Sequence, residues 1–213
     1  IRDSSQSLAY RGDLKVYKRE VPEELKDLPR RPAALYAVEG TPVKYDPEST
    51  PILMVDPFND FISDGGKLWP MVQESAEAVN LVPNLKRLAE GARSKGIQLI
   101  YTPHRRWREG DYENWKFLHG NHIGSAKLQI FAAGTWGGEW HPDLAPQAGD
   151  AVAKEHWLTS AFPNTDVDYI LRQHGIDHVV VVGLTSNTCV ESTCLLYTSD
   201  AADEGLGVDL GGR

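Results

Sequence analysis

Residues Val179–Thr193 read VVVVGLTSNTCVEST. A run of β-branched apolar residues ends at a glycine, a short polar turn follows, and Cys189 lies where a helix is expected to begin. The pattern predicts a buried strand that delivers a cysteine to a helix N-terminus, where backbone N–H groups and the helix dipole stabilise a thiolate. The alternative interpretation is a buried, inert cysteine in an ordinary strand–helix unit.

The composition places the chain among globular proteins of ordinary size. It has 213 residues, of which 41% are hydrophobic and 24% charged. The formal net charge of −8 argues against a nucleic acid or an anionic membrane as partner, and no apolar run reaches the length of a membrane span. The two cysteines, Cys189 and Cys194, form neither a zinc pattern nor a disulfide framework, so we expect a reducing, cytoplasmic compartment.

Strand and helix patterns alternate along the chain. Besides a strand at His178–Gly183, the sequence predicts three strands and two helices, at Ile52–Val55, Ile97–Tyr101, Asp150–Lys154, Ser75–Lys95 and Val167–His174. Pro83 lies inside the first helical pattern and predicts a kink or two separate helices. The alternation predicts a three-layer α/β/α fold around a parallel, Rossmann-like sheet.

Segments outside this pattern have different characters. Residues 1–50 are polar and proline-rich, which predicts an N-terminal arm, and the domain proper spans residues 51–193. Residues 104–149 form a long, tryptophan-rich stretch that we interpret as a lid or substrate loop. Residues 194–213 read CLLYTSDAADEGLGVDLGGR and resemble the translation of a sequencing-library adapter, so we expect a non-native tail, with a natural glycine-rich tail as the alternative.

Three chemically active residues follow the carboxyl ends of three predicted strands: Asp56, Lys154 and Cys189. Functional side chains of parallel sheets gather at this edge. A carboxylate can accept a thiol proton, and a lysine can hold the charges of carboxylate and thiolate in a partly dry site. Taken singly, Asp56 could instead cap a turn and Lys154 could be a surface charge.

Three blocks of the sequence resemble signature motifs of the isochorismatase-like cysteine hydrolases. The blocks are ILMVDPFNDF, DAVAKEHWLTSAFPNTDVD and VVVVGLTSNTCVEST, in that order. The family includes nicotinamidases, N-carbamoylsarcosine amidohydrolases and ureidoacrylate amidohydrolases. The resemblance covers about Pro51 to Thr193, and it implies that the last strand and helices of the family fold would follow Thr193 and are absent here.

The resemblance implies a reaction and a set of catalytic residues. Asp56, Lys154 and Cys189 would form a triad that hydrolyses a C–N bond of a small amide or ureido compound through a thioester. A cis peptide bond is implied between Leu184 and Thr185, and the N–H groups of Thr185 and Cys189 would form the oxyanion hole. Family members commonly form homo-oligomers, so we expect one here.

Further site expectations concern substrate and metal. The candidate substrate contacts are Phe61, His104, Trp107, Trp136, Trp157 and Phe162. Nicotinamidases of the family carry an Asp-x-His metal motif after the second strand, where this chain reads Thr102-Pro103-His104, so we expect no metal and no cofactor. Five scattered histidines are interpreted as loop or pocket residues: His104, His119, His122, His141 and His156. Three arginines either bind a substrate carboxylate or are solvated: Arg105, Arg106 and Arg108.

Two other functions stay open at the level of sequence. The isochorismatase branch of the family cleaves an enol ether without covalent catalysis, but its members generally lack the cysteine found at position 189. The other possibility is an inactive, truncated fragment or an oligomerising scaffold, since an incomplete sheet would leave apolar surface uncovered.

Overall fold

Four parallel strands form the centre of the protein. The computed structural model describes residues 45–176 and 178–197, and in that part the sheet has the order β3-β2-β1-β4. The strands are β1 (Ile52–Val55), β2 (Leu99–Thr102), β3 (Ala151–Val152) and β4 (Val180–Gly183). All four predicted strands are therefore confirmed, but the prediction that the strand before Cys189 is buried is wrong, because β4 lies at an edge of the described sheet and is partly exposed. β3 is shorter than predicted, because the chain leaves the sheet after Val152 and returns to it only as an isolated bridge at His156.

The helical segments lie between and after the strands. They are α2 (Asn59–Ile62), α3 (Trp69–Ala78), α4 (Leu81–Ser94), α5 (Gly120–Leu128), α6 (Val167–Gln173), the 3₁₀ turns η1 (Trp136–Gly138) and η2 (Pro142–Leu144), and the π-helical turn η3 (Ser186–Val190). The predicted break near Pro83 occurs at Asn80, whose φ of 47° is left-handed. Pro83 is the third residue of α4, where an N–H would have no helical partner.

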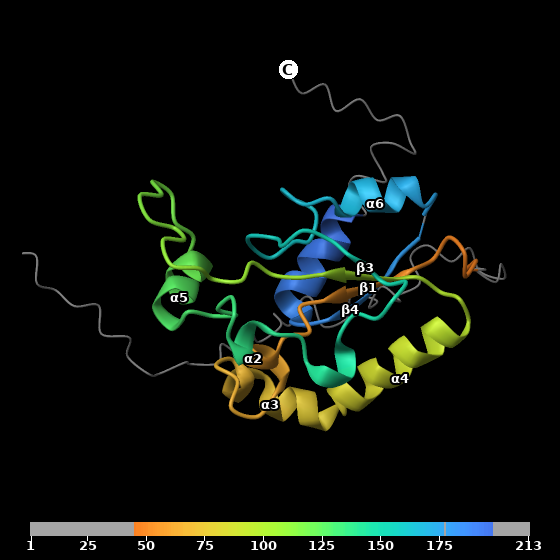
Figure 1. Cartoon of the computed structure of the whole chain (residues 1–213), viewed down its shortest axis with the longest axis horizontal. Helices are drawn as coiled ribbons and strands as arrows, with labels where there is room; N and C mark the ends of the chain where they lie inside the picture. Colours follow the sequence, from red (N-terminus) through yellow and green to blue (C-terminus); the bar gives the residue numbers. More distant parts are fainter. Residues whose placement is uncertain (1–44, 177, 198–213) are drawn as a thin grey trace, which may run out of the picture. The chain divides into compact units, whose positions relative to one another are not determined.

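The sheet is covered on both faces, which confirms the three-layer α/β/α prediction. Ile52 and Met54 of β1 point to one face and pack with Leu85 and Ala89 of α4. Leu53 points to the opposite face, where it belongs to the same buried cluster as Val167 of α6. Figure 1 shows α3 and α4 on one side of the strands and α6 on the other. The alternation of β1 side chains thus builds both cores from one strand.

The strand register brings distant parts of the chain to one edge. Val55, the last residue of β1, pairs with Thr102 of β2 on one side and with Gly183 of β4 on the other. Gly183 has a φ of 122°, and a Cβ there would lie 2.1 Å from the Val55 carbonyl oxygen, so only glycine fits this crossing. The residues that follow β1, β2 and β4 consequently emerge side by side.

The long segment of residues 104–149 is more structured than expected, since it contains α5, η1 and η2. Asp60 holds this segment where it returns toward the sheet. Its Oδ2 accepts a hydrogen bond from the Phe131 N–H at 2.7 Å. Gly137 lies against the same carboxylate, with room for no Cβ. Residues 1–44 and 198–213, which include most of the predicted arm and tail, lie outside the described residues. No described helix is long and apolar enough to cross a membrane.

Candidate active site

Asp56 is the first residue after β1 and is completely buried. Its φ of 53° is left-handed, a conformation that aspartate tolerates better than most residues but that still costs energy. Its Oδ1 lies 3.0 Å from Nε2 of His156. Its Oδ2 is buried and has no hydrogen-bond partner among the described residues. One carboxylate oxygen is thus held, and the other remains free to accept a proton.

Cys189 lies in the π-helical turn η3, and only 6% of its surface is exposed. Burial raises the pKa of its thiol, and the charge of the neighbouring Asp56 carboxylate raises this pKa further. The sulfur therefore carries its proton at neutral pH. Burial and the nearby anion therefore act against the thiolate that we expect the backbone N–H groups of a helix N-terminus to stabilise.

Several hydrogen bonds hold the turn between β4 and Cys189. The peptide bond between Leu184 and Thr185 is cis, where the family resemblance implies one. The Thr185 carbonyl oxygen accepts hydrogen bonds from the N–H groups of Thr188 and Val190, at 3.1 and 3.2 Å. The Thr188 hydroxyl lies 3.8 Å from the Cys189 sulfur, and it and the Thr185 backbone both act to lower the pKa of the thiol. Thr185 and Cys189 are therefore neighbours in space as well as in sequence.

Lys154 is not brought to this group. Its side chain is exposed, and its backbone N–H donates to Asp166 at 2.7 Å. Lys154 is exposed like Val152, while Ala153 between them is buried. No described ion pair or hydrogen bond joins the Lys154 side chain to Asp56 or Cys189, so its place in the triad stays a prediction.

His156 occupies the position expected for the cation. It is completely buried, and its Nδ1 lies 2.7 Å from the Leu158 carbonyl oxygen. The bridge between His104 and His156 draws this segment against the end of β2, with their ring centroids 5.0 Å apart. Burial alone would lower the pKa of His156, but the Asp56 carboxylate raises it above the ordinary value of 6.5. Burial lowers the pKa of His104, which is therefore neutral.

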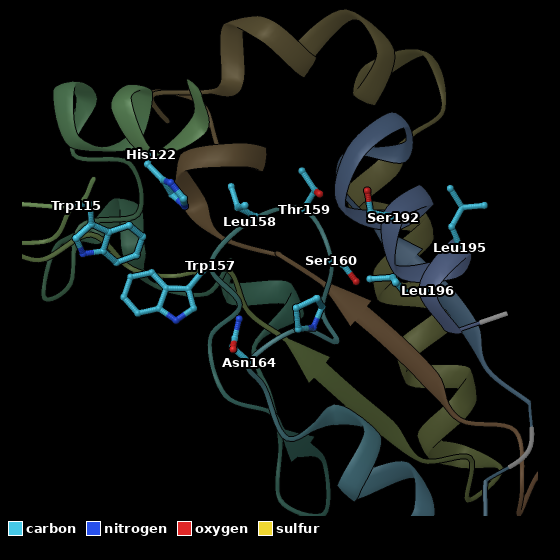
Figure 2. Close-up of a pocket in the computed structure, with 11 residues that line it drawn as sticks. Trp115, His122, Trp157, Leu158, Thr159, Ser160, Asn164, Ser192, Leu195 and Leu196 are labelled. Atoms are coloured by element: carbon cyan, nitrogen blue, oxygen red, sulfur yellow. The ribbon is translucent and has the colours of Figure 1, made fainter. Parts of the chain in front are cut away.

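A cavity of about 810 Å³ adjoins these residues (Figure 2). Its walls come from the α5 region, from the chain after His156 and from the helical residues after Cys189. The lining residues are Trp115, His122, Trp157, Leu158, Thr159, Ser160, Pro163, Asn164, Ser192, Leu195 and Leu196. Leu158 supplies the carbonyl that holds His156, and Ser192 follows Cys189 by three residues, which is one helical turn. Asp56, His156 and Cys189 do not line the cavity themselves; the cavity is related to them through Trp157, Leu158 and Ser192, which are close to His156 and Cys189 in the chain.

The six predicted substrate contacts have different positions. Trp157 lines the cavity, and His104 lies beside His156. Phe61 belongs to the core beneath α4, where its ring centroid is 5.0 Å from that of Phe131, and Phe162 packs with the core on the other face. Phe61 is buried, Phe162 is only partly buried, and neither lines the cavity, so a substrate contact for either stays a prediction. Trp107 and Trp136 are partly exposed in the long segment and do not line the cavity.

The three arginines that follow His104 are paired with acidic side chains, and Arg108 is in addition about half exposed to solvent. Glu155 receives all three, and the shortest contact is 2.8 Å from Arg106. Arg105 also pairs with Asp111 at 2.7 Å and stacks on the Trp157 ring. The ion pairs fasten the start of the long segment to the chain beside His156, and they hold the pKa of Glu155 below its usual range despite burial.

Sequence reasoning missed two features of the site. The sequence pattern places His156 among scattered histidines, although it lies in the same motif block as Lys154. Trp115 stands out only as one of the tryptophans of residues 104–149. Nothing in either residue's local pattern distinguishes it, because both roles depend on contacts across the sheet edge. No three His, Cys, Asp or Glu side chains in the described part of the chain group as a metal ion would require.

Comparison with known proteins assigns the family. Residues 50–208 match the isochorismatase domain. Ureidoacrylate amidohydrolase RutB of Caulobacter segnis is 33% identical over 163 residues, which cover 71% of this chain and 67% of that protein. The corresponding protein of Serratia proteamaculans is 31% identical over 193 residues, covering 84% and 73% of the two chains.

Two solved structures have the same fold. A cysteine hydrolase from Pseudomonas syringae pv. phaseolicola superposes with a TM-score of 0.62 at 27% identity, covering 73% of this chain and 68% of that chain. N-carbamoylsarcosine amidase from Thermoplasma acidophilum gives a TM-score of 0.54 at 27% identity, covering 70% and 77%. Together with the domain match and the RutB identities, these similarities show that the chain belongs to the isochorismatase family.

Proposed function

We propose that this enzyme hydrolyses the C–N bond of a small amide or ureido compound, with Cys189 as the nucleophile. The observation that carries the proposal is the buried thiol of Cys189 beside Asp56, whose Oδ2 has no hydrogen-bond partner among the described residues. The named relatives support the reaction class, since they are a ureidoacrylate amidohydrolase and an N-carbamoylsarcosine amidase.

The first half of the reaction forms a thioester. Because the resting sulfur is protonated, it attacks only as its proton passes to Oδ2 of Asp56. The new Sγ–C bond forms while the carbonyl electron pair moves to oxygen. The N–H groups of Thr185 and Cys189, at the bonded turn before the sulfur, would donate to that oxyanion. Asp56 then returns the proton to the leaving amine as the C–N bond breaks.

Water completes the reaction in the second half. Asp56 again accepts a proton, now from the water that attacks the thioester carbonyl. The tetrahedral intermediate collapses, the S–C bond breaks, and the proton returns to sulfur. The products are the amine, or ammonia, and the acid or carbamate of the substrate.

The cavity indicates the kind of molecule that reaches Cys189. Among its described lining residues there is no Asp, Glu, Lys or Arg, while Trp115 and Trp157 supply aromatic surface and Ser160 and Asn164 supply hydrogen-bonding groups. The nearby arginines are already paired with Glu155. We therefore propose a substrate whose bound portion is neutral and planar, rather than one recognised through a carboxylate.

An ammonia-release screen tests the proposal. The panel contains ureidoacrylate, N-carbamoylsarcosine, and neutral aromatic and aliphatic amides, with Cys189→Ala as the matched control. We expect release from neutral amides or ureides by the parent chain and none by Cys189→Ala, which should keep its circular dichroism spectrum. A folded Cys189→Ala variant with normal turnover would refute the nucleophile.

Covalent modification of Cys189 distinguishes the proposed function from enol-ether hydrolysis, the reaction of the isochorismatase branch. Iodoacetamide alkylation of Cys189 should abolish amide hydrolysis, whereas a non-covalent enzyme would tolerate it. If the protein is an inactive scaffold, no compound in the screen should release ammonia. A longer version of the chain should give the same result in that screen.

A further inference from the structure

Both ring nitrogens of His156 face acceptors. Nδ1 lies 2.7 Å from the Leu158 carbonyl oxygen, and Nε2 lies 3.0 Å from Asp56 Oδ1. A carbonyl oxygen can only accept, so Nδ1 must carry a proton. A neutral ring protonated at Nδ1 would present only a lone pair to Asp56, and two lone pairs repel. The contact between His156 and Asp56 therefore requires one further proton in the pair.

We propose that His156 is the cationic positioning residue of this site, sharing that proton with Asp56 and serving where the family resemblance assigned Lys154. The proposal rests on the proposed function. Asp56 is completely buried, and a buried carboxylate without a counter-charge would take up a proton and cease to be a base. His156 supplies the counter-charge and holds Oδ1, so that Oδ2 remains available to the Cys189 thiol.

The surrounding charges favour the shared proton. Asp56 faces the His156 ring from the end of β1, neutral His104 from the end of β2, and Glu155 acts from the same segment. The Glu155 charge is largely compensated by three arginines. Cys189, which reaches Asp56 from η3, is a neutral thiol. Within the part of the chain that the structure describes, Asp56 is thus the one uncompensated anion beside His156, and it raises the pKa of the imidazole.

The consequence for catalysis has a defined sign. Below the raised pKa of His156 the pair holds its proton and Asp56 stays fixed and charged. As pH rises through that pKa, the proton is lost, Nε2 and Oδ1 repel, and the carboxylate is no longer held. Hydrolysis should decline on the alkaline side for this reason, while a permanent cation at position 156 would remove the decline.

Nitrogen NMR of the full chain labelled with ¹⁵N-histidine tests the proton directly, and needs no substrate. His156→Gln identifies the His156 signals. We expect both ring nitrogens to be protonated below the titration midpoint, a midpoint above the ordinary pKa of 6.5, and a lower midpoint in Asp56→Asn. A midpoint at or below 6.5, or a midpoint that Asp56→Asn leaves in place, would overturn the proposal.

Alkylation of Cys189 by iodoacetamide, read by peptide mass because Cys194 can also react, tests the role of the charge. His156→Gln keeps an N–H donor but no charge, and His156→Lys restores a charge. We expect the rate at pH 7 to fall about tenfold in His156→Gln and to return to within about threefold of the parent in His156→Lys. His174→Gln, at the exposed end of α6, is the matched control.

The outcomes separate the two proposals. If His156→Gln reacts like the parent, His156 is only a hydrogen-bond donor and the cationic role is wrong. If no amide or ureide is hydrolysed but the NMR titration and alkylation behave as expected, the proposed function fails and the proton-sharing pair stands. Circular dichroism checks that each variant is folded, and the NMR comparison of the parent with Asp56→Asn remains decisive if His156→Lys does not fold.

Discussion

Nε2 of the His156 imidazole lies 3.0 Å from Oδ1 of Asp56, and neither side chain is exposed to solvent. The pair joins the end of β1 to a segment 100 residues later, beyond β3 at the far edge of the sheet. Burying two such groups is costly unless each meets the other and further partners, and His156 has the Leu158 carbonyl as its second. The catalytic roles proposed for Asp56 and His156 depend on this contact.

Asp56→Asn should lower the pKa of the Cys189 thiol and still reduce the turnover of the enzyme. Removing the negative charge lowers the pKa of the thiol, so the midpoint of iodoacetamide alkylation should shift to lower pH. Turnover should nevertheless fall by about 10²–10⁴-fold, because no base remains to accept the proton. Alkylation profiles and ammonia release measure the two effects. A variant with both properties like the parent would show that Asp56 is not the base.

Substitutions at Lys154 and His156 distinguish two catalytic groups. The family resemblance implies Lys154 beside Asp56 and Cys189, and our proposal has His156 in its place. Lys154 is exposed, so Lys154→Ala should lower turnover far less than His156→Gln, which should reduce it by about 10–100-fold. Steady-state kinetics on an accepted amide gives the comparison. The reverse order of effects would restore Lys154 to the catalytic group and assign His156 a packing role.

The stability of the fold should also depend on pH through His156. Its pKa is raised in the folded state, so its contribution is complete below about pH 6.5 and is lost as pH rises through the folded pKa. The free energy of unfolding should therefore fall above pH 6.5 in the parent and fall less in His156→Gln. Urea titrations between pH 6 and 8.5 measure this, below the ordinary pKa of 9.0 for Cys189. Equal slopes for both proteins would contradict the raised pKa.

Asp60 should be a structural rather than catalytic carboxylate. Its oxygens accept from the N–H groups of Lys67 at 3.1 Å and Phe131 at 2.7 Å. Asp60→Ala leaves these donors unsatisfied and should destabilise the protein by about 2–5 kcal/mol in urea unfolding. Asp168→Ala is the control, because its pair with Arg172 is half-exposed and worth at most about 0.5 kcal/mol. Similar losses for both variants would argue against the buried anchor.

Two glycine substitutions should act in opposite directions. At Gly183 an added Cβ meets the Val55 carbonyl oxygen at 2.1 Å, and φ is 122°, so Gly183→Ala should cost more than about 2 kcal/mol. Gly91, inside α4, has no atom within 4 Å of an added Cβ, and Gly91→Ala should stabilise the fold by about 0.5–1 kcal/mol. Thermal unfolding gives both signs. A neutral Gly183→Ala would mean that β1 and β4 can separate.

The sequence by itself determined the strands, the layers and two of the catalytic candidates. The run Ile52–Val55 is apolar throughout, which favours a strand buried on both faces, and the structure buries all four residues. The run before Gly183 favours the same, but β4 is only partly buried. Parallel strands place the residues after their carboxyl ends at one edge. Asp56 and Cys189 follow directly from that rule.

Only the tertiary structure shows which side chain of the segment after β3 contacts Asp56 and how deeply the Cys189 sulfur is buried. Lys154 and His156 are two residues apart, and no local pattern tells which one turns inward where the chain leaves an edge strand after only two residues. The bridge to His104 turns His156 inward. Likewise, the helix-start pattern favours a thiolate at Cys189, but its protonation depends on burial and on Asp56, which reaches it from a strand 130 residues earlier. Burial and charge depend on distances between segments, and those exist only once the chain has folded.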